Sequence, residues 1–129
     1  MTKKIEALIR TEKLEAVKQA LSDIGIVGMT VLQVHGQGRQ GGLALEWPTG
    51  VYKVDLLPRY QLNIVLSDHN VEKTVETICA AAYTGQPGDG IIFVYPVEEV
   101  IRIRTGERGR AALSYPDDID VRGAGADPT

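Results

Sequence analysis

In the first third of the chain, hydrophobic residues first alternate with polar ones, then recur every three or four positions, and then form a β-branched stretch. Residues 3–9 alternate apolar and polar side chains, which predicts a strand. Residues 11–24 carry apolar side chains three or four positions apart, which predicts a helix with Thr11 as its N-cap and Gly25 as its stop. Residues 29–34 are rich in β-branched side chains and predict a second strand.

The same order of elements recurs in the second half of the chain. Residues 60–66 alternate as a strand does, and residues 71–82 have helical spacing with Asn70 as the predicted N-cap. After a Gly- and Pro-rich break at 84–90, residues 91–95 predict another strand. Two successive β-α-β units indicate an α+β protein with the ferredoxin-like double βαβ sandwich, in which both helices cover one face of a mainly antiparallel sheet.

The second face of such a sheet is left uncovered by the two helices. Apolar residues such as Ala7 and Leu62 alternate with polar ones along the strands, and we expect them to give this face an apolar character. Oligomerisation would bury the uncovered face.

Composition and charge narrow the functional classes. The chain has 129 residues and a mass of 14.0 kDa, with 14 Lys and Arg against 17 Asp and Glu. This balance argues against a nucleic-acid-binding protein, which normally has a basic surplus. No apolar run approaches the ~20 residues of a membrane span, and no signal peptide is visible. The single cysteine, Cys79, fits a reducing compartment and is expected to be a packed thiol, so we expect one cytoplasmic domain.

The connection between the two units, residues 36–57, carries the first indication of a binding site. Its start contains closely spaced glycines, which allow backbone N–H groups to approach an anion, and Arg39 adds a positive charge. On its own this pattern also fits an ordinary flexible hairpin. A link of this length without structure of its own is uncommon in a compact domain and is usually functional.

Two further segments favour phosphate binding. Residues 88–90 form a tight glycine turn before a strand, and residues 100–106 alternate so that Arg102 and Arg104 are predicted to share one strand face. Paired arginines can hold a polyphosphate through charge-assisted hydrogen bonds, although a solvated edge with surface ion pairs fits the same residues. Three phosphate-compatible segments in one small domain make a nucleotide site the stronger interpretation.

Taken together, these segments resemble the PII signal-transduction family. The resemblance covers residues 1 to about 112 and rests on residues 28–31, 36–40, 52, 54–58, 84–85, 88–90 and 100–106. It implies a trimer of ferredoxin-like subunits that bind ATP or ADP in the clefts between them, with no required catalytic activity. It also implies a long T-loop, about residues 37–57, that reaches a target membrane transporter or metabolic enzyme.

The resemblance also implies a set of site residues. Nucleotide binding is expected of Thr30, Gly36, Gly38, Arg39, Gln40, Gly88, Asp89, Gly90, Arg102 and Arg104. In members that sense 2-oxoglutarate, the glutamine matched by Gln40 ligates the Mg ion of bound Mg-ATP. Arg59 replaces the family lysine that pairs with the effector carboxylate, and Arg can still hold a carboxylate. Tyr52 stands where nitrogen-regulatory members carry their uridylylated tyrosine, although its neighbours differ.

One departure affects the expected nucleotide. The family carries a lysine directly after the Gly-Asp-Gly turn, where this chain has Ile91. Loss of one charge-assisted contact costs on the order of 1–3 kcal/mol, and we expect it to affect a triphosphate more than a shorter phosphate chain. We therefore expect ADP or AMP to bind at least as tightly as ATP.

Two alternatives to nitrogen control stay open at this point. Ile91 and the altered T-loop tip fit a PII-like regulator of carbon metabolism, linked to bicarbonate uptake or carboxysomes. An acylphosphatase-like enzyme has the same fold and a Gly-rich loop that ends in arginine, as residues 34–39 do. In that enzyme the loop opens a helix, whereas here a glycine pair and a long loop follow, so the enzyme is the weaker interpretation.

The last residues, 113–129, extend beyond the resemblance. They are acidic and poor in apolar side chains. Such a segment buries too little to offset the entropy of ordering, so we expect a mobile extension. The predicted division is a PII-like ferredoxin-fold domain at 1–112 and an acidic extension at 113–129.

Overall fold

A computed structural model describes residues 1–37, 43–47, 50–54, 56–113 and 115–121. Its helices and strands are β1 (Thr2–Arg10), α1 (Leu14–Asp23), β2 (Thr30–Gly36), β3 (Leu43–Trp47), β4 (Gly50–Val54), β5 (Leu57–Ser67), α2 (Val71–Ala82) and β6 (Gly90–Val97). The two predicted units are β1-α1-β2 and β5-α2-β6.

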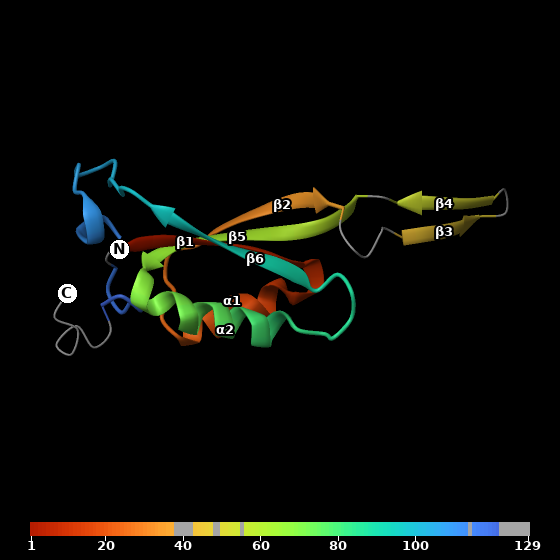
Figure 1. Cartoon of the computed structure of the whole chain (residues 1–129), viewed down its shortest axis with the longest axis horizontal. Helices are drawn as coiled ribbons and strands as arrows, with labels where there is room; N and C mark the ends of the chain where they lie inside the picture. The colour runs from red at the N-terminus through yellow and green to blue at the C-terminus, as the bar shows by residue number, and fades with distance from the viewer. Residues whose placement is uncertain (38–42, 48–49, 55, 114, 122–129) are drawn as a thin grey trace.

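Four of the strands form one antiparallel sheet in the order β2-β5-β1-β6. Both helices pack on the same face of this sheet, and β2 and β6 are its edges (Figure 1). The predicted ferredoxin-like α+β arrangement is confirmed. Among the helices that the structure describes, none combines the length and the apolar character that a membrane crossing requires.

The core lies between the helices and one face of the sheet. Ala7 and Leu62 pair directly across β1 and β5, and both are completely buried in this core. Because paired side chains share a face, our placement of these two residues on the uncovered face is wrong. That face instead carries Leu8 opposite Ile91, and Phe93 opposite Glu6, with Ile91 and Phe93 52% and 40% exposed.

Both helices begin differently from the prediction. Each follows a short 3₁₀ turn, Thr11–Lys13 before α1 and Asp68–Asn70 before α2, and neither predicted cap makes a side-chain capping hydrogen bond. Thr11 is the first residue of its turn, and its hydroxyl donates to the Glu12 carboxylate. Asn70 does occupy the N-cap position, but its side-chain amide donates to the carboxylate of Asp120, 2.7 Å away.

The long connection between the two units contains a hairpin. β3 and β4 pair antiparallel from Leu43 with Val54 to Trp47 with Gly50, and the hairpin projects from one end of the four-stranded sheet (Figure 1). The sequence predicts a long T-loop for this connection and leaves an ordinary flexible hairpin as the alternative. Leu45, which pairs with Tyr52, illustrates why it is more than that, since apolar and aromatic side chains on both sides of the turn favour strand pairing.

Residues 115–121 pack against the domain, which differs from the mobile extension expected there. The backbone N–H of Ile119 donates to the carbonyl of Gly25 at 2.7 Å, and its side chain is only 7% exposed and joins the core. The carboxylate of Asp120 accepts from the backbone N–H of Ser67 at 3.0 Å as well as from Asn70. One apolar side chain and one well-placed carboxylate therefore give this acidic stretch specific partners. The rest of the extension lies outside the described residues.

Candidate functional site

The predicted glycine turn before β6 is held in a backbone conformation that requires glycine. Gly85, Gly88 and Gly90 have φ angles of 85°, 98° and 118°, which side chains of L-residues rarely adopt. A Cβ at Gly90 would also collide with the carbonyl oxygen of Leu8 on the neighbouring strand β1. This turn therefore approaches the end of β1 as closely as its backbone permits.

Asp89 fixes the same turn from within. Its carboxylate accepts hydrogen bonds from the backbone N–H groups of Thr84 and Gly85, at 2.8 and 2.9 Å, and from the Thr84 hydroxyl. Arg10 adds a charged hydrogen bond of 3.0 Å from its Nε atom. The Thr84 hydroxyl and backbone bonds, with smaller contributions from Arg10 and Gly85, hold the pKa of Asp89 well below its usual range. In this geometry Asp89 positions the turn.

Arg10 is a site residue that was not predicted from the sequence. It ends β1 and reaches across to the turn, where it also donates to the carbonyl of Pro87 at 2.7 Å. Its side chain is only 14% exposed. The signal that could have identified it is local: an arginine closes a strand whose preceding alternate positions are apolar, and so it must find a partner beyond the strand's end.

Arg59 and Gly36 lie at the same end of the sheet as the turn. Arg59, near the start of β5, pairs with Arg10 of β1, and its guanidinium donates to the carbonyl of Pro58 at 3.0 Å. Gly36 is the last residue of β2 and pairs with Leu57. This end therefore holds Gly36, Arg59, Gly88, Asp89 and Gly90, which we call the turn end. Gly38, Arg39 and Gln40, the expected Mg ligand among them, lie outside the described residues.

Arg102 and Arg104 do not share a strand face, so that prediction is wrong. They lie in a tight hairpin closed by a bridge between Ile101 and Arg108. The N–H of Arg102 donates to the carbonyl of Glu107, and the N–H of Gly106 donates to the carbonyl of Arg102, at 2.9 and 2.8 Å. Gly106 has a φ of 73°, which turns the chain back and interrupts the alternation assumed from sequence.

The two arginines lie far from the turn end. They follow β6, whose last residue, Val97, pairs with Thr2, whereas its first residue, Gly90, pairs with Ile9. Seven residue steps along a strand span about 23 Å. Thr30 begins β2 and lies between the two ends. We call the region of Arg102 and Arg104 the hairpin end.

Tyr52 lies on β4, where it pairs with Leu45 within the hairpin that projects beyond the turn end. The backbone position is thus known, and modification of Tyr52 stays a prediction. Among the residues that the structure describes, no cluster of three or more His, Cys, Asp or Glu side chains is arranged to hold a metal ion.

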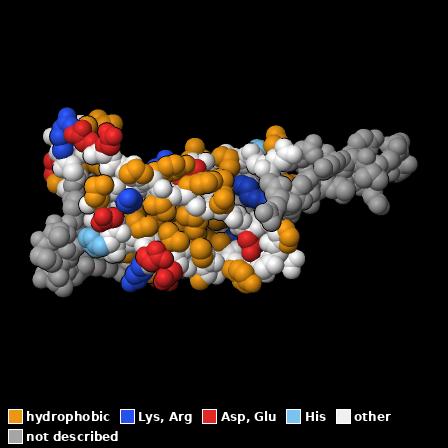
Figure 2. Space-filling view, viewed as in Figure 1, with side chains coloured by type: hydrophobic (Ala, Val, Ile, Leu, Met, Phe, Trp, Pro, Cys, Tyr) orange, Lys and Arg blue, Asp and Glu red, His pale blue; other side chains and the backbone are white. Residues whose placement is uncertain are grey.

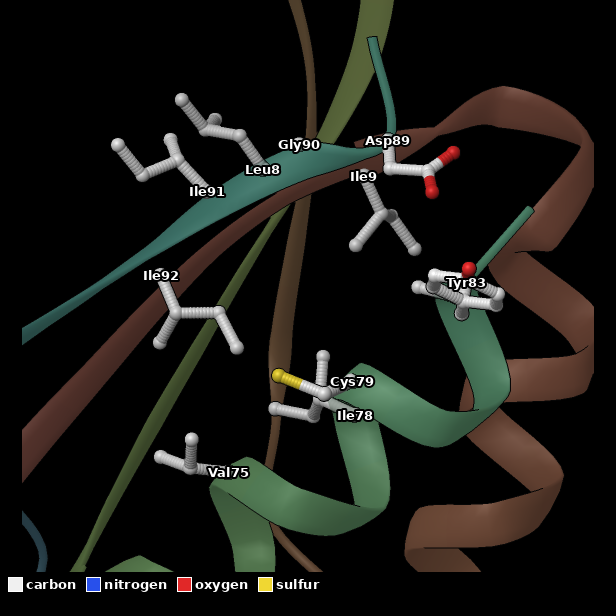
Figure 3. A pocket seen from close by; sticks show the side chains of 11 residues that line it. Leu8, Ile9, Val75, Ile78, Cys79, Tyr83, Asp89, Gly90, Ile91 and Ile92 are labelled. Atoms are coloured by element: carbon white, nitrogen blue, oxygen red, sulfur yellow. The ribbon is translucent and has the colours of Figure 1, made fainter. Parts of the chain in front are cut away.

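A groove of about 260 Å³ runs between β6 and α2. Figure 3 shows Ile92, Val75 and Cys79 facing one another across it, with Asp89 at one end. The prediction that Cys79 is packed is wrong, since the thiol is exposed in this groove. Apolar side chains dominate the lining, so the groove does not resemble a phosphate site. Figure 2 shows hydrophobic side chains gathered over this part of the molecule.

Comparisons with known proteins agree with this geometry. The family model described as "Nitrogen regulatory protein P-II" matches residues 2–107. The nitrogen regulatory protein P-II of Azospirillum brasilense is 50% identical over 111 residues, covering 86% of this chain and 99% of the relative. P-II protein 1 of Methanothermobacter thermautotrophicus is 53% identical over 111 residues, covering 86% and 96%.

A solved structure supports the same relationship. The structure of Arabidopsis thaliana PII bound to citrate has a TM-score of 0.71 and 39% sequence identity to this chain, covering 86% of it and 91% of the Arabidopsis chain. The relatives named here are regulatory proteins by their descriptions. On the strength of the match to its family model and of these relatives, the chain belongs to the nitrogen regulatory P-II family.

Proposed function

We propose that this protein is a homotrimeric regulator that senses adenine nucleotides and acts through its T-loop on a membrane transporter or enzyme of nitrogen metabolism. It works in the cytoplasm, and regulation requires no catalysis by the chain itself. Family membership supports the regulatory role. The nucleotide, the trimer and the target are our proposal.

The observation that carries the proposal is the separation of the phosphate-compatible residues into two groups. The turn end and the hairpin end are about 23 Å apart along β6, which is too far for one small nucleotide to bridge within a single subunit. A ring of subunits joined head to tail brings the turn end of one copy to the hairpin end of the next. One complete site would then form at each interface.

The surface of β6 supports assembly with further copies. β6 is an edge strand, and Ile91, Phe93, Val94 and Tyr95 are each 40–52% exposed along it. A long apolar edge strand is a template for pairing with another chain and is normally covered in the working protein. Ile103 at the hairpin end is fully exposed as well. A trimer would cover both surfaces.

Mutation of one arginine tests nucleotide binding. Arg104→Ala should weaken ADP binding about tenfold or more, as expected for loss of a charge-assisted hydrogen bond. Arg108→Ala is the matched control, because Arg108 lies in the same hairpin and pairs with Glu99. We expect its ADP affinity to stay within twofold of the wild type by calorimetry. Equal affinities for all three proteins would contradict the assignment.

Mixed assemblies test whether the site lies between subunits. Chains with Arg39→Ala and chains with Arg104→Ala should each bind ADP poorly as homotrimers. When equal amounts of the two chains assemble at random in a head-to-tail ring, about a quarter of the interfaces combine an intact Arg39 from one chain with an intact Arg104 from the next. These interfaces should bind ADP normally. Absence of any restored sites, or a monomer mass by light scattering, would exclude a shared site.

The effector beside the nucleotide is also part of the proposal. Arg59 is half-buried at the turn end and carries the charge that an organic carboxylate requires. The citrate bound to the Arabidopsis relative is such an anion and supports this class of ligand. Titration with 2-oxoglutarate and with bicarbonate, each with ADP or Mg-ATP present, separates nitrogen control from the alternative of carbon control. A heat of binding that is seen with bicarbonate and not with 2-oxoglutarate would favour carbon control.

A further inference from the structure

The arginine expected to hold phosphate is in contact with the chain's own C-terminal segment. The guanidinium of Arg102 donates through Nη2 to the carbonyl oxygen of Ala112, 3.0 Å away. It also lies 5.6 Å from the centre of the Tyr115 ring, within the range of a cation–π interaction. An arginine binds a phosphate through the N–H groups at the edge of its guanidinium, so a phosphate would compete with the Ala112 carbonyl for Nη2, while the Tyr115 ring covers one face of the group.

The Tyr115 ring fills the space beside the loop that leads into β2. A Cβ placed on Gly28 would lie 3.3 Å from Cε2 of Tyr115, so the ring rests directly against this glycine. Gly28 precedes Thr30 by two residues, and Thr30 is one of the residues proposed to bind the nucleotide. Tyr115 therefore lies between the segment that carries Thr30 and Arg102, the arginine proposed for the phosphates.

The segment that carries Tyr115 is fixed at its other end. Ile119 places its side chain in the core and donates its N–H to Gly25, and Asp120 accepts hydrogen bonds from Ser67 and Asn70. Between these contacts and the ring, the chain makes a tight turn in which the N–H of Asp118 donates to the carbonyl of Tyr115 at 3.1 Å. These anchors keep the ring at a high local concentration beside Arg102.

We propose that residues 115–121 form a strap whose Tyr115 competes with adenine nucleotide for Arg102 and the surface at Gly28. The inference rests on the proposed function and adds regulation to it. Binding of a nucleotide then requires that the ring leave Arg102, and the apparent affinity falls by the fraction of molecules in which the ring has left. If that fraction is about a tenth, the strap weakens binding about tenfold.

Calorimetry with ADP on five full-length or shortened proteins tests this competition. A chain that ends at Leu113 lacks the strap, and we expect it to bind ADP about tenfold more tightly than the wild type. A chain that ends at Val121 keeps the strap and should match the wild type. Tyr115→Ala should gain affinity about as much as loss of the whole strap, whereas Tyr115→Phe keeps the ring and should stay within twofold of the wild type.

The outcomes separate the strap from the nucleotide site. Equal or weaker ADP binding by both the chain ending at Leu113 and Tyr115→Ala would overturn the strap and leave the proposed function standing. If none of the proteins binds ADP, both fall together. Should the shortened chain fail to fold because Ile119 is lost from the core, the Tyr115→Ala and Tyr115→Phe pair decides the question, since both keep the anchors.

Discussion

The burial of Ile119 predicts a large loss of stability from a residue in a stretch that reads as a solvated tail. Ile119→Ala removes three carbons from a side chain that is 7% exposed and packed in the core. At about 0.8 kcal/mol for each buried carbon, the transfer contribution is about 2.4 kcal/mol. The cavity left behind adds to this, so we expect about 2–4 kcal/mol. Ile119→Val removes one carbon and should cost about 0.5–1.5 kcal/mol.

Urea unfolding followed by circular dichroism measures this graded series. All proteins must be compared at one concentration, because the stability of an oligomer depends on it. Val27→Ala is the surface control: Val27 is 53% exposed, and its replacement should change the free energy of unfolding by no more than about 0.5 kcal/mol. If Ile119→Ala falls within the range of this control, Ile119 is not packed in solution and the strap has lost its anchor.

Three further predictions concern the turn before β6. Gly90→Ala should destabilise the fold by at least about 2 kcal/mol in urea, because its φ is positive and a Cβ would meet the backbone of Leu8, whereas Gly36→Ala, which has open space around it, should cost less than about 1 kcal/mol. The pKa of Asp89 is lowered by folding, so its contribution to stability is complete above the ordinary Asp pKa of about 3.9 and declines below it. The difference in urea midpoint between wild type and Asp89→Asn should therefore be constant from pH 7 to about 5 and shrink as the pH falls below about 4. Ile91→Lys should strengthen ATP binding by up to about 1–3 kcal/mol and AMP binding by less in calorimetry, and an equal gain for both nucleotides would show that the new charge does not reach the outer phosphates.

The order of elements and the fold class could be predicted because the relevant signals are local. Alternation in β1 and helical spacing in α1 and α2 depend on neighbours a few positions away. The pairing of β1 with both β5 and β6 then follows from the small number of ways in which two β-α-β units can form one sheet. Alternation does not show which face of the sheet the helices cover, because that is a tertiary property. The prediction therefore places Ala7 and Leu62 on the wrong face.

Site residues could be predicted from the sequence only where their role depends on the local backbone conformation. The glycine turn was recognisable because positive φ angles restrict the residue type. The contact between Arg10 and Asp89 joins residues 79 positions apart, so a local signal at the end of β1 cannot identify the partner of Arg10. The alternation around Arg102 predicts a strand, but Gly106 turns the chain back and the same residues form a hairpin. A single buried isoleucine was hidden by the acidic composition around it.

The contact between Ile119 and Gly25 has a consequence for how the chain is made. Residues are synthesised from the N-terminus, and the first β-α-β unit emerges well before its partners β5 and β6 exist. Contacts between residues far apart in sequence slow folding, because a long loop must close before they form. The apolar site that receives Ile119 at the end of α1 is among the last parts of the core to be filled. A nascent chain halted just short of residue 119 would leave this apolar site exposed to chaperones and to other unfinished chains.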